Sequence, residues 1–209
     1  MTYEDLLRQL RERQALIVHF SHHANMRDGG VFPADLHAAA LNNRTWALSS
    51  CLVWPSHHMS LPGSVGLILH PRSLASIIGI RSVDAGYSTD KYGHEQGAGD
   101  NLSQDSLIHS FDVSRGDYNE WRVRDFDVVG IYWEAENGHI YAKKHADLKH
   151  PDTGETIAQE IVMQKISVSD VHNSFPELPV FTRNGDKVVA SNANGSVLDP
   201  WRMNSSDTP

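Results

Sequence analysis

Residues 15–20, which read Ala-Leu-Ile-Val-His-Phe, are a short apolar run that contains two β-branched side chains. Runs of this length and composition are typical of a buried β-strand. The segment before it, residues 3–14, places leucines and a tyrosine at helical spacing among charged residues, which predicts an amphipathic helix with Thr2 as its N-cap. Two later apolar runs, residues 46–54 and residues 65–69, predict further buried strands, and a proline follows each of them shortly.

The rest of the chain mixes short strands with a few helices. Asn184-Gly185, between two runs rich in β-branched residues, indicates the turn of a β-hairpin over residues 181–189. Residues 156–168 alternate only in part and fit either a helix or a strand. The other expected elements are helical segments at residues 33–42 and 73–78 and strands at residues 79–83, 120–123 and 128–133. This strand-rich pattern favours the α+β class.

Length and composition bound the organisation of the chain. It has 209 residues, of which 40% are hydrophobic, and this is enough for a single α+β domain over residues 1–190. Within that domain we expect a core at about residues 15–133 and a C-terminal extension at residues 134–190. Residues 191–209 are mostly small and polar, which predicts a flexible tail.

Charge and cysteine content exclude several classes of protein. The chain holds 18 Lys and Arg against 26 Asp and Glu, so that its net charge is −8 with histidine neutral. An acidic chain lacks the basic surface that general nucleic-acid binding needs. The single cysteine, Cys51, excludes an intramolecular disulfide framework and favours a cytoplasmic location. The apolar stretches are too short to predict a membrane span or a secretory signal, so no membrane association is expected.

Thirteen histidines are an unusual number and raise the question of a metal site. His19, His22 and His23 lie close together in the sequence, and His57 and His58 form a second group. Imidazoles can hold a divalent ion where their rings converge. However, no Asp or Glu stands at a familiar spacing from them, and adjacent histidines on a turn commonly point to different sides. The histidines therefore also fit scattered loop and surface positions.

A nucleophilic hydrolase is the next alternative. Ser49, Ser50 and Cys51 stand together in an expected strand, but they are not set in the Gly-x-Ser-x-Gly turn of such enzymes. A cysteine within an apolar run is more typical of a small buried side chain than of a nucleophile.

Three separated features carry the most specific signal. The first is His19, near the end of the first expected strand. The second is the pair Ser49-Ser50 in a strand that begins with an aromatic residue. The third is Glu120, which opens a strand after a long polar region. That region includes Asp84–Gln104, a glycine-rich segment with almost no aliphatic side chain, and loops of this length are usually functional or disordered.

This order of features resembles the ADP-ribosyltransferase superfamily, whose members bind NAD⁺ in a cleft between two small sheets. The likeness covers about residues 15–133, and its motifs are short. It gives His19, the pair Ser49-Ser50 and Glu120 the places of the superfamily's Arg or His, Ser motif and Glu. It implies a split two-sheet core, NAD⁺ as co-substrate, and Asp84–Asn119 as the substrate-recognition loop. The DarT-type toxins, or another microbial toxin or effector branch, are the branches that this likeness suggests.

The cleavage of NAD⁺ implies a chemical role for each of these residues. The bond to nicotinamide breaks through an oxocarbenium-like state, which a carboxylate such as Glu120 would stabilise while binding a ribose hydroxyl. The same carboxylate could serve as general base for the acceptor. His19 would hydrogen-bond a ribose hydroxyl, and Ser49 would support either the ribose or the carboxylate. The catalytic residues implied are Glu120, His19 and Ser49, and those implied to contact NAD⁺ are His19, Phe20, Ser21, Ser49, Ser50, Tyr87 and Tyr118.

The chain also departs from the superfamily pattern. Members that modify arginine carry an acidic or amide residue two positions before the Glu, where this chain has Tyr118. Modification of protein arginine is therefore disfavoured relative to a nucleobase, another side chain or a small molecule. On an exposed strand face, moreover, Glu120 would simply pair with Arg122 or Arg124, a contact worth under about 1 kcal/mol.

The sequence predicts an NAD⁺-dependent ADP-ribosyltransferase, a glycosyltransferase that moves ADP-ribose to a protein side chain or nucleic acid and releases nicotinamide. Such an enzyme would act as a cytoplasmic toxin or effector, and its partner would be an antitoxin or immunity protein. Two alternatives stay open: a histidine-dependent metal hydrolase built on His19, His22, His23 and His57 or His58, and a non-enzymatic acidic binding or inhibitor module that uses residues 84–104.

Overall fold

The computed structural model describes residues 1–20, 25–26, 47–82, 88–89, 95–96, 101–113, 117–134, 139–184 and 187–191. The helix expected at residues 33–42, residues 192–209 of the expected tail and most of Asp84–Gln104 lie outside these ranges. In chain order the elements are α1 (Tyr3–Glu12), β1 (Leu16–Phe20), β2 (Asn25–Met26), β3 (Leu48–Val53), β4 (Val65–Pro71), η1 (Leu74–Ser76), β5 (Ile77–Arg81), β6 (Ser88–Thr89), β7 (Glu95–Gln96), α3 (Gln104–His109), β8 (Glu120–Val123), β9 (Phe126–Trp133), β10 (His139–Lys149), β11 (Thr156–Ser167), α4 (Val168–Ser174), β12 (Val180–Asn184) and β13 (Lys187–Ser191).

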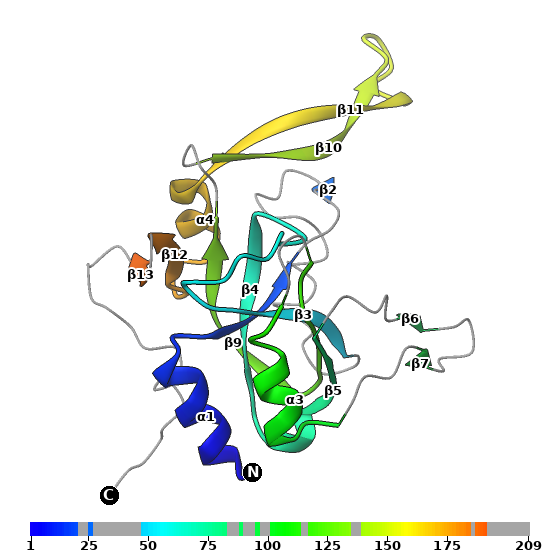
Figure 1. The fold of residues 1–209 in the computed structure, drawn as a ribbon. Helices are drawn as coiled ribbons and strands as arrows, with labels where there is room; N and C mark the ends of the chain where they lie inside the picture. Colours follow the sequence, from blue (N-terminus) through cyan, green and yellow to red (C-terminus); the bar gives the residue numbers. More distant parts are fainter. Residues whose placement is uncertain are drawn as a thin grey trace, which may run out of the picture.

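One large sheet organises these elements (Figure 1). Its eight strands hydrogen-bond in the order β13-β12-β9-β4-β1-β3-β8-β5, and every neighbouring pair is antiparallel except β12 and β9. Two smaller groups, β11-β10-β2 and β6-β7, complete the strands of the described chain. A large, mostly antiparallel sheet with few helices confirms the α+β class that the sequence predicts.

Strand β3 divides the large sheet into two parts. Its second half pairs with β1, from Leu16 opposite Val53 to Val18 opposite Cys51. Its first half pairs with β8, from Leu48 opposite Val123 to Ser50 opposite Trp121. The two neighbours of β3 therefore bond to different stretches of it, so that β1 and β8 diverge along β3 rather than flanking it along its full length.

The core consists of the inward side chains of this sheet and of the helices that pack on it. Trp121, Tyr132 and Phe20 are among the largest side chains that are fully buried. Helix α1 adds Leu6 and Leu10, which have no exposed surface. Burial of a side chain of this size contributes about 1.5–3 kcal/mol. The apolar periodicity of residues 3–14 thus identifies the face of α1 that meets the core.

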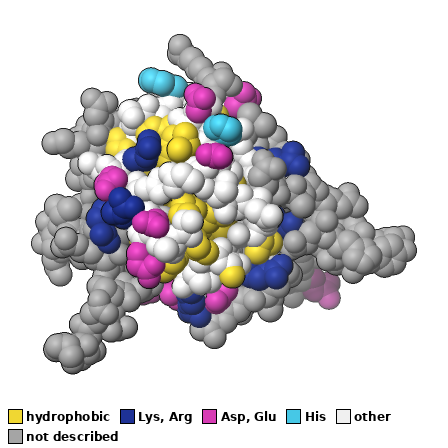
Figure 2. Space-filling view, turned by 60° about the horizontal axis from the view of Figure 1, so that its bottom comes forward, with side chains coloured by type: hydrophobic (Ala, Val, Ile, Leu, Met, Phe, Trp, Pro, Cys, Tyr) yellow, Lys and Arg dark blue, Asp and Glu magenta, His cyan; other side chains and the backbone are white. Residues whose placement is uncertain are grey.

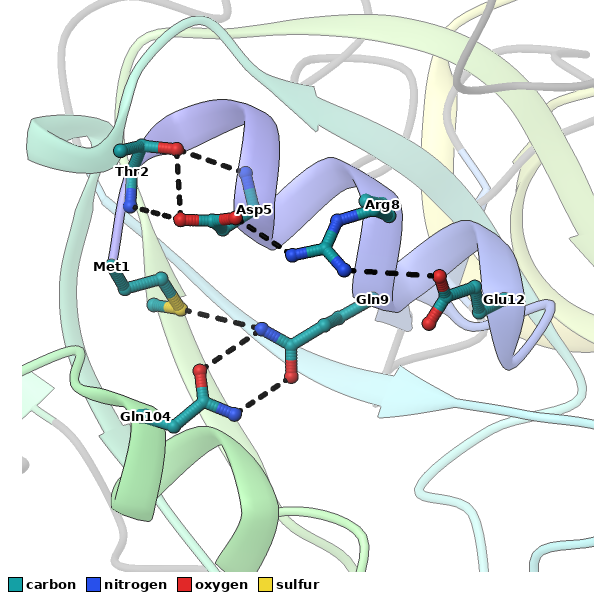
Figure 3. A network of polar contacts seen from close by, with 7 residues as sticks. All are labelled: Met1, Thr2, Asp5, Arg8, Gln9, Glu12 and Gln104. Carbon is teal, nitrogen blue, oxygen red and sulfur yellow. Dashed lines mark hydrogen bonds and ion pairs between the residues drawn. The ribbon is translucent and has the colours of Figure 1, made fainter.

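Polar contacts fix the start of α1 and join this helix to α3 (Figure 3). Thr2 and Asp5 form a reciprocal capping box, as the expected N-cap at Thr2 requires. The side-chain amides of Gln9 and Gln104 exchange two hydrogen bonds of 3.0 and 2.9 Å. Because Gln104 is the first residue of α3, this pair ties the start of that helix to α1.

The C-terminal extension contains a long antiparallel hairpin of β10 and β11, which projects from the body in Figure 1. The pairing runs from His139 opposite Ser167 to Lys149 opposite Thr156. Residues 156–168, for which the sequence allows helix or strand, are thus a strand up to Ser167. The hairpin expected over residues 181–189 is also present, because β12 and β13 pair up to Asn184 opposite Lys187.

Gly66 in β4 allows the close approach of β4 to β1 at His19. A Cβ atom on Gly66 would lie 2.6 Å from the carbonyl oxygen of His19 and 2.6 Å from a methyl carbon of Val18. The carbonyl belongs to the backbone and cannot rotate away. We therefore expect Gly66→Ala to lower the free energy of unfolding by about 1–3 kcal/mol in denaturant titrations.

Gly154 provides the matched control for this substitution. It lies in the turn between β10 and β11 with φ of 70°, and a Cβ there would meet no atom within 4 Å. Gly154→Ala should cost only the strain of the left-handed backbone, about 1–2 kcal/mol. Equal melting behaviour of wild type and Gly66→Ala would contradict the close packing of β4 against β1.

The face seen in Figure 2 carries charges of both signs. Lys and Arg side chains are interspersed there with Asp and Glu around patches of apolar side chains. The visible described surface thus lacks a large field of one sign, which general nucleic-acid binding would need. Within the residues placed by the structure, no helix is long and apolar enough to cross a membrane.

Candidate functional site

Three adjacent strands bring His19, Ser49 and Glu120 together. The His19 ring on β1 lies with its Nδ1 atom 2.7 Å from the backbone carbonyl oxygen of Ser49 on β3. The Ser49 hydroxyl donates a hydrogen bond of 2.7 Å to Oε1 of Glu120, the first residue of β8. The three residues that the sequence singles out are thus linked by two hydrogen bonds, one through the Ser49 backbone and one through its side chain.

The position of His19 follows from the divergence of β1 and β3. Pairing between these strands ends at Val18 opposite Cys51, whereas β1 stays paired with β4 through His19 opposite Leu67. The imidazole of His19 bridges to β3 at this point. Because a carbonyl oxygen only accepts, Nδ1 must carry the proton in this contact, and Nε2 is then the acceptor of a neutral ring.

Strand alternation separates the two serines of the pair. Ser49 is partly exposed and faces Glu120, whereas Ser50 is 2% exposed and its hydroxyl lies 3.5 Å from the Leu48 carbonyl oxygen. Successive residues of a strand point to opposite sides. Ser49 is therefore the residue of the pair that can take part in chemistry at Glu120.

Glu120 does not lie on a solvent-exposed strand face. It is 2% exposed, and Arg122, two residues further along the same face of β8, is also buried. Arg122 stands opposite Ser49 in the pairing of β3 with β8. The expectation of a solvated strand face at Glu120 is therefore wrong, and the weak energy of exposed ion pairs does not apply to a carboxylate buried there.

Asn119, which the sequence analysis does not single out, holds the backbone beside Glu120. Its side-chain amide is fully buried and makes three contacts to backbone groups. Oδ1 accepts from the Leu52 N–H at 2.6 Å, and Nδ2 donates to the carbonyl oxygens of Leu52 at 2.9 Å and Ser110 at 3.1 Å. Nδ2 also lies 3.3 Å from the Met59 sulfur. In the sequence, the feature that could have pointed to Asn119 is its place as a polar residue directly before the strand expected at residues 120–123.

The aromatic residues expected to contact NAD⁺ are placed in different surroundings. The Phe20 ring is buried and packs edge-on against Tyr132 at 5.7 Å between centroids, so it belongs to the core. The Tyr118 side chain is partly buried and packs against the same core. Ser21, Tyr87, His22 and His23 lie outside the described residues.

The histidines and the cysteine that the described ranges contain do not gather into a metal or nucleophile site. His57 is buried and His58 is exposed, so these adjacent rings lie in different environments. No group of three or more His, Cys, Asp or Glu side chains within the described part of the chain is arranged to hold a metal ion. Cys51 is buried in β3, as its apolar neighbours predict.

His57 is instead a buried structural group. Its Nδ1 atom accepts from the Met59 N–H at 3.2 Å, and its carbonyl oxygen accepts from Arg183 at 3.1 Å. Nε2 therefore carries the proton of the neutral ring, and it has no hydrogen-bond partner among the described residues. Burial, together with the nearby Arg183 guanidinium, lowers the pKa of His57 from 6.5 to about 4.

This lowered pKa predicts acid sensitivity. In the unfolded chain His57 is protonated below about pH 6.5, whereas in the folded chain it is protonated only below about pH 4. Between these values the unfolded state binds more protons, so the free energy of unfolding falls as the pH drops. We expect a loss of up to about 3 kcal/mol below pH 4 and none from this group above pH 6.5. His57→Asn, which retains an acceptor for the Met59 N–H, should flatten the dependence measured by denaturant titration at several pH values.

His70, whose pKa burial also lowers, would leave part of the acid sensitivity in His57→Asn. An unchanged slope of stability against pH in that variant would show that His57 is not the group responsible. This pH dependence is separate from the proposed catalytic role of Glu120, because the hydrogen bonds described for His57 join it to Met59 and Arg183.

Comparison with known proteins adds no relative. No protein-family model matches the chain, and searches of curated proteins and of solved structures give no match either. The assignment of a function therefore depends on the residues and on their geometry.

Proposed function

We propose that this protein is an NAD⁺-dependent ADP-ribosyltransferase that moves ADP-ribose to a macromolecular acceptor and releases nicotinamide. One observation carries the proposal: His19, Ser49 and Glu120, selected from the sequence by their order, are joined by hydrogen bonds across β1, β3 and β8. They are 30 and 71 residues apart in the chain. The contact between Ser49 and Glu120 requires this strand register, because a shift of β3 by one residue would turn the Ser49 side chain away from Glu120.

The residues divide the chemistry between them. In the proposed reaction the bond between C1′ of the ribose and the nicotinamide nitrogen breaks, and nicotinamide leaves as a neutral molecule with the bonding electron pair. Glu120 would stabilise the positive charge that develops on the ribose and would hold one of its hydroxyls. An acceptor nucleophile then bonds to C1′ and gives up its proton, for which the Glu120 carboxylate would be the base.

Ser49 and His19 orient this centre. The Ser49 hydroxyl donates to Oε1 of Glu120 and so restricts the carboxylate to one direction. His19 is fixed by the carbonyl oxygen of the same Ser49, so its ring moves with β3 as well as with β1. Both side chains are partly exposed while Glu120 is buried. In the proposed site, His19 and Ser49 are thus the more accessible of the three residues to a ribose.

The superfamily-like core is part of the same proposal. The changeover on β3, where β1 and β8 bond to different halves of the strand, supports a core split into two parts with the site at the division. NAD⁺ is a co-substrate in this scheme, and the acceptor is a protein side chain other than arginine or a nucleic acid. A toxin or effector role, with an antitoxin or immunity partner, belongs to the proposal as well.

Release of nicotinamide from NAD⁺ by the purified full chain, with and without cell lysate, tests this function. We expect release in at least one condition, and labelled NAD⁺ then identifies the acceptor. We also expect NAD⁺ to raise the melting temperature, because a ligand that binds only the native state stabilises it. Absence of release in both conditions would overturn the proposal, whether or not NAD⁺ raises the melting temperature. Stoichiometric zinc in the purified protein would point instead to the metal hydrolase.

A further inference from the structure

Asn119 stands where the pairing between β3 and β8 would continue. The ladder matches Leu48 with Val123 and Ser50 with Trp121. The next residue on β8 is Glu120, and the same register then places Asn119 opposite Leu52. Opposite residues of an antiparallel ladder alternate between hydrogen-bonded and non-hydrogen-bonded pairs, and this pair would be a hydrogen-bonded one, because the N–H and the carbonyl oxygen of Leu52 both bond toward residue 119.

The side chain of Asn119 makes these bonds instead of its backbone. Oδ1 accepts from the Leu52 N–H and Nδ2 donates to the Leu52 carbonyl oxygen, so one amide satisfies both groups of Leu52. The orientation of the amide is determined, because exchanging its O and N would set a donor against the Leu52 N–H. The interposed side chain holds the backbone of residue 119 further from β3 than a direct ladder would.

Glu120 is therefore held between two different attachments to β3. On one side Trp121 pairs with Ser50 through the backbone ladder. On the other side Asn119 reaches Leu52 through its amide. Adjacent Cα atoms are about 3.8 Å apart, so any shift of residue 119 passes directly to Glu120.

We propose that Asn119 is a positioning residue that sets the Glu120 carboxylate at the Ser49 hydroxyl by substituting a side-chain amide for the last ladder step between β8 and β3. This inference rests on the proposed function. The contact of Nδ2 with the Ser110 carbonyl oxygen also attaches Asn119 to the end of α3, a helix that lies within the expected substrate-recognition loop Asp84–Asn119. This amide thus attaches the start of β8 to both β3 and α3, while the pairing of Glu120 with Arg81 attaches it to β5 on the other side.

Asn119→Asp and Ser110→Ala form a matched pair for the test, with Asn119→Ala as a variant without added charge. Asn119→Asp is the same size and still accepts from the Leu52 N–H, but a carboxylate has no donor and a protonated carboxyl has only one, so it cannot donate to both carbonyl oxygens as the amide does. Ser110→Ala removes the bond from the Trp121 indole and leaves the amide of Asn119 in place. All are compared as full chains, at a temperature where circular dichroism shows them folded.

We expect both Asn119 variants to lower kcat for nicotinamide release by about 10- to 100-fold while KM for NAD⁺ stays within about 2-fold, because the carboxylate is misplaced and the remaining contacts to NAD⁺ persist. Ser110→Ala should lower the melting temperature and keep kcat within about 2-fold of wild type. Wild-type kcat in folded Asn119 variants overturns the positioning role alone. Equal losses in all three variants, or failure of both Asn119 variants to fold, also overturn it. An inactive wild type overturns the proposed function, and this inference with it.

Discussion

Replacement of Glu120 by Gln is expected to abolish nicotinamide release, with a fall in rate of at least about 100-fold. The amide has the shape of the carboxylate and can still accept from the Ser49 hydroxyl, so the fold should persist. What it lacks is the negative charge that stabilises the developing oxocarbenium ion. Initial rates with saturating NAD⁺ measure the effect, and calorimetric titration checks that NAD⁺ still binds.

The control for Glu120→Gln is Glu155→Gln. Glu155 is exposed in the turn that joins β10 and β11, outside the row of His19, Ser49 and Glu120. Glu155→Gln removes the same charge from the chain as Glu120→Gln does, and it should leave the rate of nicotinamide release unchanged. If Glu120→Gln also retained the wild-type rate, the chemistry of any NAD⁺ cleavage would have to be assigned to another group.

Replacement of Asn119 by Ala is expected to give the largest loss of stability among these variants, about 3–5 kcal/mol. The substitution leaves the N–H and carbonyl oxygen of Leu52 and the carbonyl oxygen of Ser110 without the amide that pairs with them. Each buried polar group that loses its partner costs about 1–3 kcal/mol. Denaturant titration at neutral pH, where histidine titration contributes little, measures the loss.

Asn101→Ala serves as the comparison, because Asn101 is exposed and a surface substitution changes stability by about 0.5 kcal/mol or less. A loss below about 1 kcal/mol in Asn119→Ala would mean that water or another group replaces the amide. The side chain would then not hold the start of β8.

Local patterns were sufficient to predict the elements around the site. The apolar run at residues 15–20 became β1, and the alternation of Glu120, Trp121, Arg122 and Val123 became β8, with Trp121 and Val123 in the core. These predictions succeed because strand formation there follows from apolar content and period, both visible in a short window. The length of β10 escaped prediction, because its charged residues resemble those of a loop.

The site itself depends on register, which a single sequence does not display. The order of His19, the serine pair and Glu120 predicts which residues to compare, but only the pairing of β3 with β8 distinguishes Ser49 from Ser50. The role of Asn119 was not predicted for the same reason, because its hydrogen-bond partners Leu52 and Ser110 are 67 and 9 residues away in the chain. The ladder determines such long-range contacts, and no local motif marks them.

The most direct test of this account is a crystal structure of Glu120→Gln with NAD⁺. The account predicts the nicotinamide ribose at the row formed by His19, Ser49 and residue 120, with a ribose hydroxyl within about 3 Å of the residue 120 side chain. NAD⁺ bound elsewhere on the chain, or a ribose turned away from these three side chains, would contradict it.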